Sequence, residues 1–172
     1  MTKTQLLDTL LGEHYLAIQA AIAVLDRPTL DLSRYAIAVV RQGEDDFVLL
    51  FDQSENVAAR ENLGVKRDGD APLKASEIAA LLANVDETET LDRIRGGSLR
   101  PIEKGAATFL TRFDADLAEY RIKLMENDKS LVAIFTDKDR KPGTKGHTPK
   151  RPGYEVEMKA KDLTVVRSNF LR

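Results

Sequence analysis

The chain contains no cysteine and no tryptophan, and only two histidines. The lack of cysteine excludes disulfides, thiolate nucleophiles, iron–sulfur clusters and all cysteine-ligated zinc sites. With two histidines and no cysteine, a transition-metal site is not expected. Aromatic residues make up 6% of the chain, too few to favour an aromatic platform for stacking sugars or bases. We therefore expect neither a metal nor a cofactor.

Long apolar stretches are also missing. No segment approaches the roughly 20 consecutive apolar residues that a membrane-spanning helix requires. Near the N-terminus, Asp8 and Glu13 interrupt the apolar run too early for the core of a signal peptide. The sequence thus predicts a soluble, cytoplasmic protein without a membrane segment.

The overall composition is that of one globular domain. The chain has 172 residues, of which 42% are hydrophobic and 31% are charged. This length and apolar fraction suffice for one hydrophobic core, and the mixed charges describe a solvated surface. We expect a single α+β domain over residues 1–172, with a flexible basic loop at 137–153.

Charge is unevenly distributed along the chain. The formal net charge is −2, but residues 137–172 hold ten lysines or arginines against five acids, a balance of +5. The preceding part therefore carries −7. Such polarity concerns solubility and partners rather than fold, and it suits electrostatic steering of a partner.

Helical periodicity is clearest in two long segments. Apolar residues recur at steps of three and four over about Thr4–Leu25 and again over about Pro101–Glu126, which predicts two amphipathic helices. A shorter helix is expected around Ile78–Val85. Two more short helices are predicted from Ser54 to about Leu63 and, through a capping box, from Asp86 to Ile94.

Strand patterns lie between and after these helices. The runs Tyr35–Arg41 and Phe47–Phe51 are apolar on both faces and predict a buried β-hairpin. Leu131–Phe135 reads as a further strand, and Tyr154–Ala160 alternates strictly between apolar and charged residues. Leu163–Val166 extends that strand or forms another.

The predicted fold class follows from these elements. It is α+β, with an antiparallel sheet of about four to five strands packed with two long amphipathic helices and two to three short helices. The order helix–hairpin occurs twice, which raises an internal duplication as an interpretation of topology. We find no residue-level match between the halves in the sequence.

The most distinctive segment is the basic loop, where prolines and glycines prevent regular structure. Its cationic residues form a candidate polyanion-binding site, and they are Arg140, Lys141, Lys145, His147, Lys150 and Arg151. The alternative is a mobile, solubilising loop or one that contacts a protein partner.

Three acidic or histidine residues invite a chemical interpretation. Asp137 and Asp139 follow an apolar strand, and two carboxylates so spaced can hold magnesium, although the surrounding lysines compete for them. Paired surface charges are the alternative. His14 lies on the apolar stripe of the first helix, where we expect a hydrogen-bonded core or interface histidine.

The sequence contains no recognisable catalytic motif, so the leading hypothesis is a non-enzymatic protein-binding module. It would be a small bacterial or phage adaptor, inhibitor, immunity or chaperone-like protein. The alternatives are nucleic-acid or polyanion binding through residues 138–151, and a metal-dependent enzyme using Asp137 and Asp139. The broad apolar stripe of the first helix also suggests a homodimer through that helix.

Overall fold

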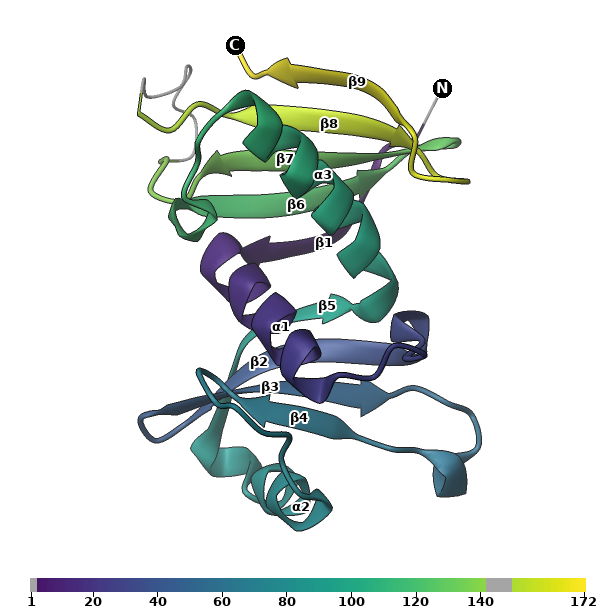
Figure 1. The fold of residues 1–172 in the computed structure, drawn as a ribbon, viewed down its shortest axis with the longest axis vertical. Helices are drawn as coiled ribbons and strands as arrows, with labels where there is room; N and C mark the ends of the chain where they lie inside the picture. Colours follow the sequence, from purple (N-terminus) through teal and green to yellow (C-terminus); the bar gives the residue numbers. More distant parts are fainter. Residues whose placement is uncertain (1–2, 142–149) are drawn as a thin grey trace. The chain divides into compact units, whose positions relative to one another are not determined.

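The computed structural model describes residues 3–141 and 150–172. It confirms the α+β class with antiparallel strands, which form two sheets rather than one. Figure 1 shows the three α-helices and nine strands of the described residues. The helices are α1 (Gly12–Leu25), α2 (Ala75–Ala83) and α3 (Leu99–Arg112), and the strands are β1 (Gln5–Leu11), β2 (Tyr35–Gln42), β3 (Asp45–Asp52), β4 (Leu63–Lys66), β5 (Thr88–Arg95), β6 (Tyr120–Glu126), β7 (Ser130–Asp137), β8 (Tyr154–Lys159) and β9 (Val165–Phe170).

These elements cluster into two compact units. Unit 1 comprises residues 1–13 and 98–172 and contains the five-stranded sheet β1-β6-β7-β8-β9. Unit 2 comprises residues 14–97 and contains the four-stranded sheet β4-β3-β2-β5. In unit 1, α3 lies across one face of the sheet (Figure 1). The expectation of a single domain over residues 1–172 stays a prediction.

The two units are built from the same strand order, and each takes one strand from the other half of the chain. Read along the chain, β1-α1-β2-β3-β4 is followed, after α2, by β5-α3-β6-β7-β8. The first strand of each half pairs with the hairpin of the other half. Strand β1 pairs with β6, and β5 pairs with β2. The edge strands of the two halves are therefore exchanged.

The register of the exchanged strands matches position by position. Leu10 is opposite Ile122 in unit 1, and Ile94 is opposite Ile37 in unit 2. Both exchanged strands carry a register shift at the corresponding place, just before an aspartate. Each of these aspartates accepts a hydrogen bond from the start of the helix in its own unit, Asp8 from the Ser98 hydroxyl and Asp92 from the buried His14 ring. His14 is thus a hydrogen-bonded interior histidine, as expected.

A short sequence repeat marks the same equivalence. Asp31-Leu32-Ser33-Arg34-Tyr35 and Asp116-Leu117-Ala118-Glu119-Tyr120 each form a single 3₁₀ turn, η1 (Leu32–Arg34) and η5 (Leu117–Glu119), before a strand. In both, the first aspartate accepts a hydrogen bond from the backbone N–H two residues later. The spacing Asp-Leu-x-x-Tyr is the residue-level match that the sequence analysis missed.

A glycine lies against each of these turns. A Cβ on Gly12 would overlap the carbonyl oxygen of Leu117, and a Cβ on Gly96 would overlap that of Leu32. The next carbonyl oxygen is also equivalent in the two units. It belongs to Tyr120, 3.0 Å from a Cβ on Gly12, and to Tyr35, 2.6 Å from a Cβ on Gly96. Only glycine permits the chain to pass this close to the backbone of the turn.

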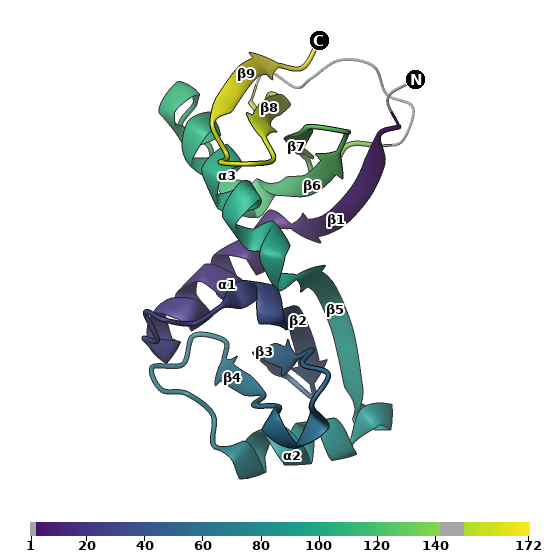
Figure 2. The ribbon, with the colours of Figure 1, turned by 90° about the vertical axis from the view of Figure 1, so that its right-hand side faces the viewer.

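The halves differ in what lies beyond their common strands. In unit 2, helix α2 covers the second face of the sheet, where Leu81 packs against Ala38, Val40 and Leu49. Figure 2 shows α1 and α2 on opposite sides of this sheet. In unit 1 no described helix takes that place, and the equivalent residues include the exposed Lys123. The second face of the sheet is therefore apolar in unit 2, where a helix covers it, and partly charged in unit 1.

Three predicted helices are corrected. Gln5–Leu11, predicted as the first turns of a helix, is strand β1, so the helix begins only at Gly12. The predicted helix to Glu126 ends at Arg112, and its remainder is η5 and β6. The segment Thr88–Arg95 is strand β5 and not a helix. In β1 and β5 the register shift interrupts the alternation of inward- and outward-facing residues that marks a strand. The apolar residues of both segments therefore also fit the spacing of a helix.

The remaining local predictions are confirmed in part. The hairpin β2–β3 is confirmed, and Tyr35–Val40 are buried on both faces. Strands β7 and β8 and helix α2 are confirmed, with the predicted alternation of burial in β8. The helix predicted from Ser54 to about Leu63 is only one 3₁₀ turn, and β4 begins at Leu63. Within residues 3–141 and 150–172, no helix has both the length and the apolar character needed to cross a membrane.

We predict that Gly96→Ala destabilises the protein. The new methyl group would overlap the Leu32 carbonyl, and forcing atoms into such a packed place costs about 1–3 kcal/mol or more. The neighbouring Gly97→Ala is the matched control, because nothing lies within 4 Å of its Cβ position and its effect should stay within about 0.5 kcal/mol. Urea unfolding of both variants measures the difference, and equal midpoints would contradict the close approach.

Candidate binding edge of the five-stranded sheet

The strands of the described residues form four sheet edges, and three of these edges carry features that discourage pairing with another chain. Strands β1 and β5 each contain a register shift and an aspartate that turns to a partner inside its own unit. Strand β4 has only four residues, and Pro72 bridges to it from its outer side. Bulges, inward-pointing charges, short length and proline are the usual means of protecting an edge.

Strand β9 is the least protected edge. Its register shift lies near its beginning, and from Arg167 onward the pairing with β8 is regular. This stretch contains no proline and one charged residue, Arg167. Two large apolar side chains of the strand are well exposed, Val166 at 57% and Phe170 at 45%. An edge of this kind can pair with an added strand.

The hydrogen bonds show which backbone groups of β9 point outward. The N–H of Leu171 donates to the carbonyl oxygen of Gly153 at 2.8 Å. In an antiparallel pair the residues bonded to the partner alternate with those that are not. Leu171 and Asn169 therefore turn their backbone groups toward β8, whereas Phe170 and Ser168 direct theirs to the open edge.

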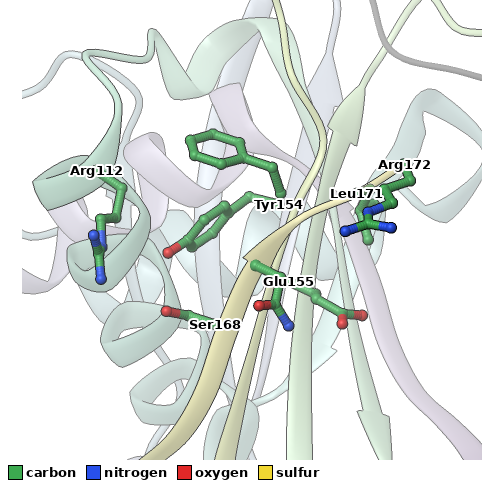
Figure 3. Close-up of a pocket in the computed structure, with 8 residues that line it drawn as sticks. Arg112, Tyr154, Glu155, Ser168, Leu171 and Arg172 are labelled. Atoms are coloured by element: carbon green, nitrogen blue, oxygen red, sulfur yellow. The ribbon is translucent and has the colours of Figure 1, made fainter.

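A hollow of about 750 Å³ lies at the end of this strand. Figure 3 shows the eight residues that line it, which are Arg112, Tyr154, Glu155, Ser168, Asn169, Phe170, Leu171 and Arg172. Five of them are consecutive. Successive side chains of a strand point to opposite faces, so the hollow reaches both faces of the sheet around the last residues of β9.

The apolar wall of the hollow is well packed. The Tyr154 ring is 2% exposed and lies 4.9 Å from the Phe170 ring, edge to face. Phe170 also meets Phe113 at 6.4 Å between ring centroids. Contacts of this kind hold an aromatic ring in place. Phe170 is thus fixed on the α3 side of the sheet and still offers almost half its surface.

The charged residues at the hollow are mainly basic. Arg112, at the end of α3, and Arg172 lie at different sides of it (Figure 3). Among the residues that the structure describes, no carboxylate forms an ion pair with Arg112. Glu155 is the acidic residue of the lining, and Arg167 lies 3.9 Å from its carboxylate. The site therefore presents positive charge beside an apolar wall.

The predicted polyanion-binding residues lie elsewhere. Lys145 and His147 lie outside the described residues. Arg151 forms ion pairs with three carboxylates, Glu119 at 2.9 Å, Asp137 at 3.1 Å and Asp139 at 2.8 Å. These carboxylates hold its side chain at the base of the loop.

The other predicted cations of the loop are less engaged. Lys141 and Lys150 are exposed, whereas Arg140 has a further interaction. Polyanion binding through the loop stays a prediction.

Asp137 and Asp139 are brought together, with an arginine between them. Asp137 Oδ1 accepts hydrogen bonds from the Asp139 backbone and from Arg151. Asp52 is its counterpart in unit 2, where it accepts from the backbone of Ser54 and from Arg34. Both aspartates thus close a turn after a strand. Within the described part of the chain, no cluster of three potential ligands that could hold a metal occurs.

Tyr120 is a buried titratable group close to Asp137. Burial raises its pKa to about 12, and the nearby Asp137 adds to the effect. Its hydroxyl donates a hydrogen bond to the carbonyl oxygen of Pro152 at 3.1 Å. It remains a neutral donor at physiological pH, which suits a structural role at the end of the basic segment.

Sequence reasoning missed the edge of β9. It placed a strand at Leu163–Val166, whereas the strand covers Val165–Phe170. The available signal was the run Val165-Val166-Arg167-Ser168-Asn169-Phe170, which is poor in charge and free of proline. That signal identifies a strand, but not that its outer side is open.

Comparison with known proteins returns no match. No protein-family model, no curated protein and no solved structure matches the chain.

We predict that Asp52→Asn destabilises the protein in a pH-dependent way. Hydrogen bonding to Arg34 holds the pKa of Asp52 well below its ordinary value. Its contribution to stability is therefore full above the unfolded-state pKa of about 3.9 and is lost as the pH falls toward the native pKa. The stability gap between wild type and variant should be largest near neutral pH and shrink below about pH 4.

Urea unfolding at several pH values measures this gap. Asp128→Asn, at an exposed turn residue, is the control and should unfold like wild type throughout. A gap for Asp52→Asn that stays constant down to acidic pH would contradict the ion pair's role.

Proposed function

We propose that the protein is a non-enzymatic protein-binding module that takes up an extended segment of a partner as an additional strand beside β9. The open edge of β9 carries the proposal, because backbone groups of Ser168 and Phe170 point away from the sheet along a hollow of about 750 Å³. An added strand would lie in this hollow. Its own backbone would complete the hydrogen bonding of the edge.

The energetics suit a specific but moderate affinity. Each hydrogen bond between the added strand and β9 contributes about 0.5–1.5 kcal/mol net. Apolar side chains of the segment gain further free energy by covering Phe170 and Val166. After the cost of ordering the segment, a dissociation constant on the order of micromolar follows. Such an interaction fits an adaptor, inhibitor, immunity or chaperone-like protein acting in the cytoplasm.

A homodimer through α1 remains a part of this proposal. The helix is apolar around much of its circumference, and Leu16 is 39% exposed. Sedimentation at increasing concentration tests it with two variants. Leu16→Asp should dissociate a dimer that forms through α1, whereas Ser168→Pro should dissociate one that forms by pairing of two β9 edges. A monomer at all concentrations contradicts both.

Peptide selection tests strand addition directly. We predict that a phage-displayed library of random dodecapeptides yields binders to the wild-type protein, and that Ser168→Pro weakens them about tenfold or more. Proline removes the outward N–H of Ser168 without removing a bond to β8, and its ring also obstructs the edge. Fluorescence anisotropy with synthetic copies of the selected peptides measures the change.

Ser168→Ala is the matched control, because it keeps the backbone donor and should bind like wild type. Near-equal melting temperatures for the three proteins show that the fold is intact. Failure to enrich any peptide, or equal binding by Ser168→Pro, would contradict strand addition at β9.

A further inference from the structure

We infer that the segment bound at β9 carries an acidic side chain two positions from an apolar one, with the carboxylate facing Arg112 and the apolar group against Phe170. This inference rests on the proposed function. It names the chemistry of the partner, an extended acidic and apolar peptide segment.

The register of an added strand places these two side chains. Ser168 and Phe170 are the residues whose backbone groups face outward, so residues of the added strand come to lie directly opposite them. Side chains of directly opposed residues lie on the same face of a sheet. Phe170 contacts Tyr154 on the side covered by α3. The two opposing residues of the segment therefore also point to the α3 side.

Arg112 is the charged residue that such a side chain meets. It is the last residue of α3, it is exposed, and it lines the hollow together with Ser168. In Figure 3 its side chain lies on the same side of β9 as Ser168 and Tyr154. A guanidinium binds a carboxylate through two parallel hydrogen bonds, a geometry that lysine cannot supply. An acidic residue opposite Ser168 thus gains a charge-assisted contact.

The nearby acidic residue does not cancel this preference. Glu155 follows the inward-facing Tyr154, so its side chain belongs to the opposite face of the strand. There it lies 3.9 Å from Arg167, which also forms an ion pair with Glu157 at 3.3 Å. Arg172 lies at a different side of the hollow from Arg112 (Figure 3), so the preference of the α3 side rests on Arg112 alone. The Arg112 guanidinium favours an anion on that side, and a basic residue at the same position would be repelled.

The apolar requirement comes from Phe170. Its ring is held by Tyr154 and Phe113 and leaves 45% of the residue exposed. A leucine, valine or aromatic side chain opposite Phe170 would cover this surface. Because Ser168 and Phe170 are two residues apart, the acidic and apolar positions of the segment are also two apart.

A charge-reversal selection tests the inference. The random dodecapeptide library is selected in parallel against the wild type, Arg112→Glu and Arg100→Glu. Arg100 is exposed at the other end of α3 and does not line the hollow, so its reversal changes net charge equally and serves as the matched control. We expect the wild type and Arg100→Glu to enrich aspartate or glutamate two positions from an apolar residue, and Arg112→Glu to enrich lysine or arginine there.

Affinity measurements complete the test. A synthetic peptide selected on the wild type should bind Arg112→Glu about tenfold more weakly, and replacing its acidic residue by the neutral amide should weaken wild-type binding to a similar extent. Raising the salt concentration should narrow both differences, because an exposed ion pair is screened.

The outcomes separate this inference from the proposed function. Binders that are lost in Ser168→Pro but show no acidic preference, or that bind Arg112→Glu unchanged, would overturn the inference and leave strand addition standing. The absence of binders to every variant would contradict strand addition itself.

Discussion

Each of the two sheets is completed by a strand from the other half of the chain, and this exchange constrains the rest of the structure. Strand β1 pairs with β6, and β5 pairs with β2, so the open side of each hairpin is satisfied by a remote segment. The chain leaves each exchanged strand through a glycine that contacts the carbonyls of a 3₁₀ turn. The pairing, the glycine and the turn form one repeated arrangement, and both hydrophobic cores are built on it.

The halves diverge only after this shared arrangement, and the candidate site arises from the divergence. In unit 2 the chain passes Pro72 against the edge of β4 and continues into α2. In unit 1 the corresponding edge of β8 is instead covered by β9, which becomes the new edge. Adding a strand leaves another row of unpaired backbone groups, whereas ending with a proline and a helix does not. The same difference explains why unit 2 has an apolar second face and unit 1 a partly charged one.

The elements that could be predicted are those whose pattern is local. The hairpin β2–β3 has two apolar runs joined by a short turn, and β8 alternates strictly, so both are legible in the sequence. Strands β1 and β5 are not, because their partners are distant and a register shift interrupts their alternation. The correspondence between the two halves was hidden for a related reason. Its clearest trace, Asp-Leu-x-x-Tyr before a strand, is short and lies in turns that no periodicity marks.

The sequence by itself determined the α+β class, the buried hairpin, the absence of cysteine chemistry and the polarity of charge, because each depends on composition or on neighbours along the chain. The tertiary structure decided which strands complete each sheet, that Arg151 lies among Glu119, Asp137 and Asp139, and that no strand of the described residues pairs with the outer side of β9. These properties depend on which remote segments meet. An unpaired edge is a relation between a strand and the rest of the fold, so it has no signature in the strand's own residues.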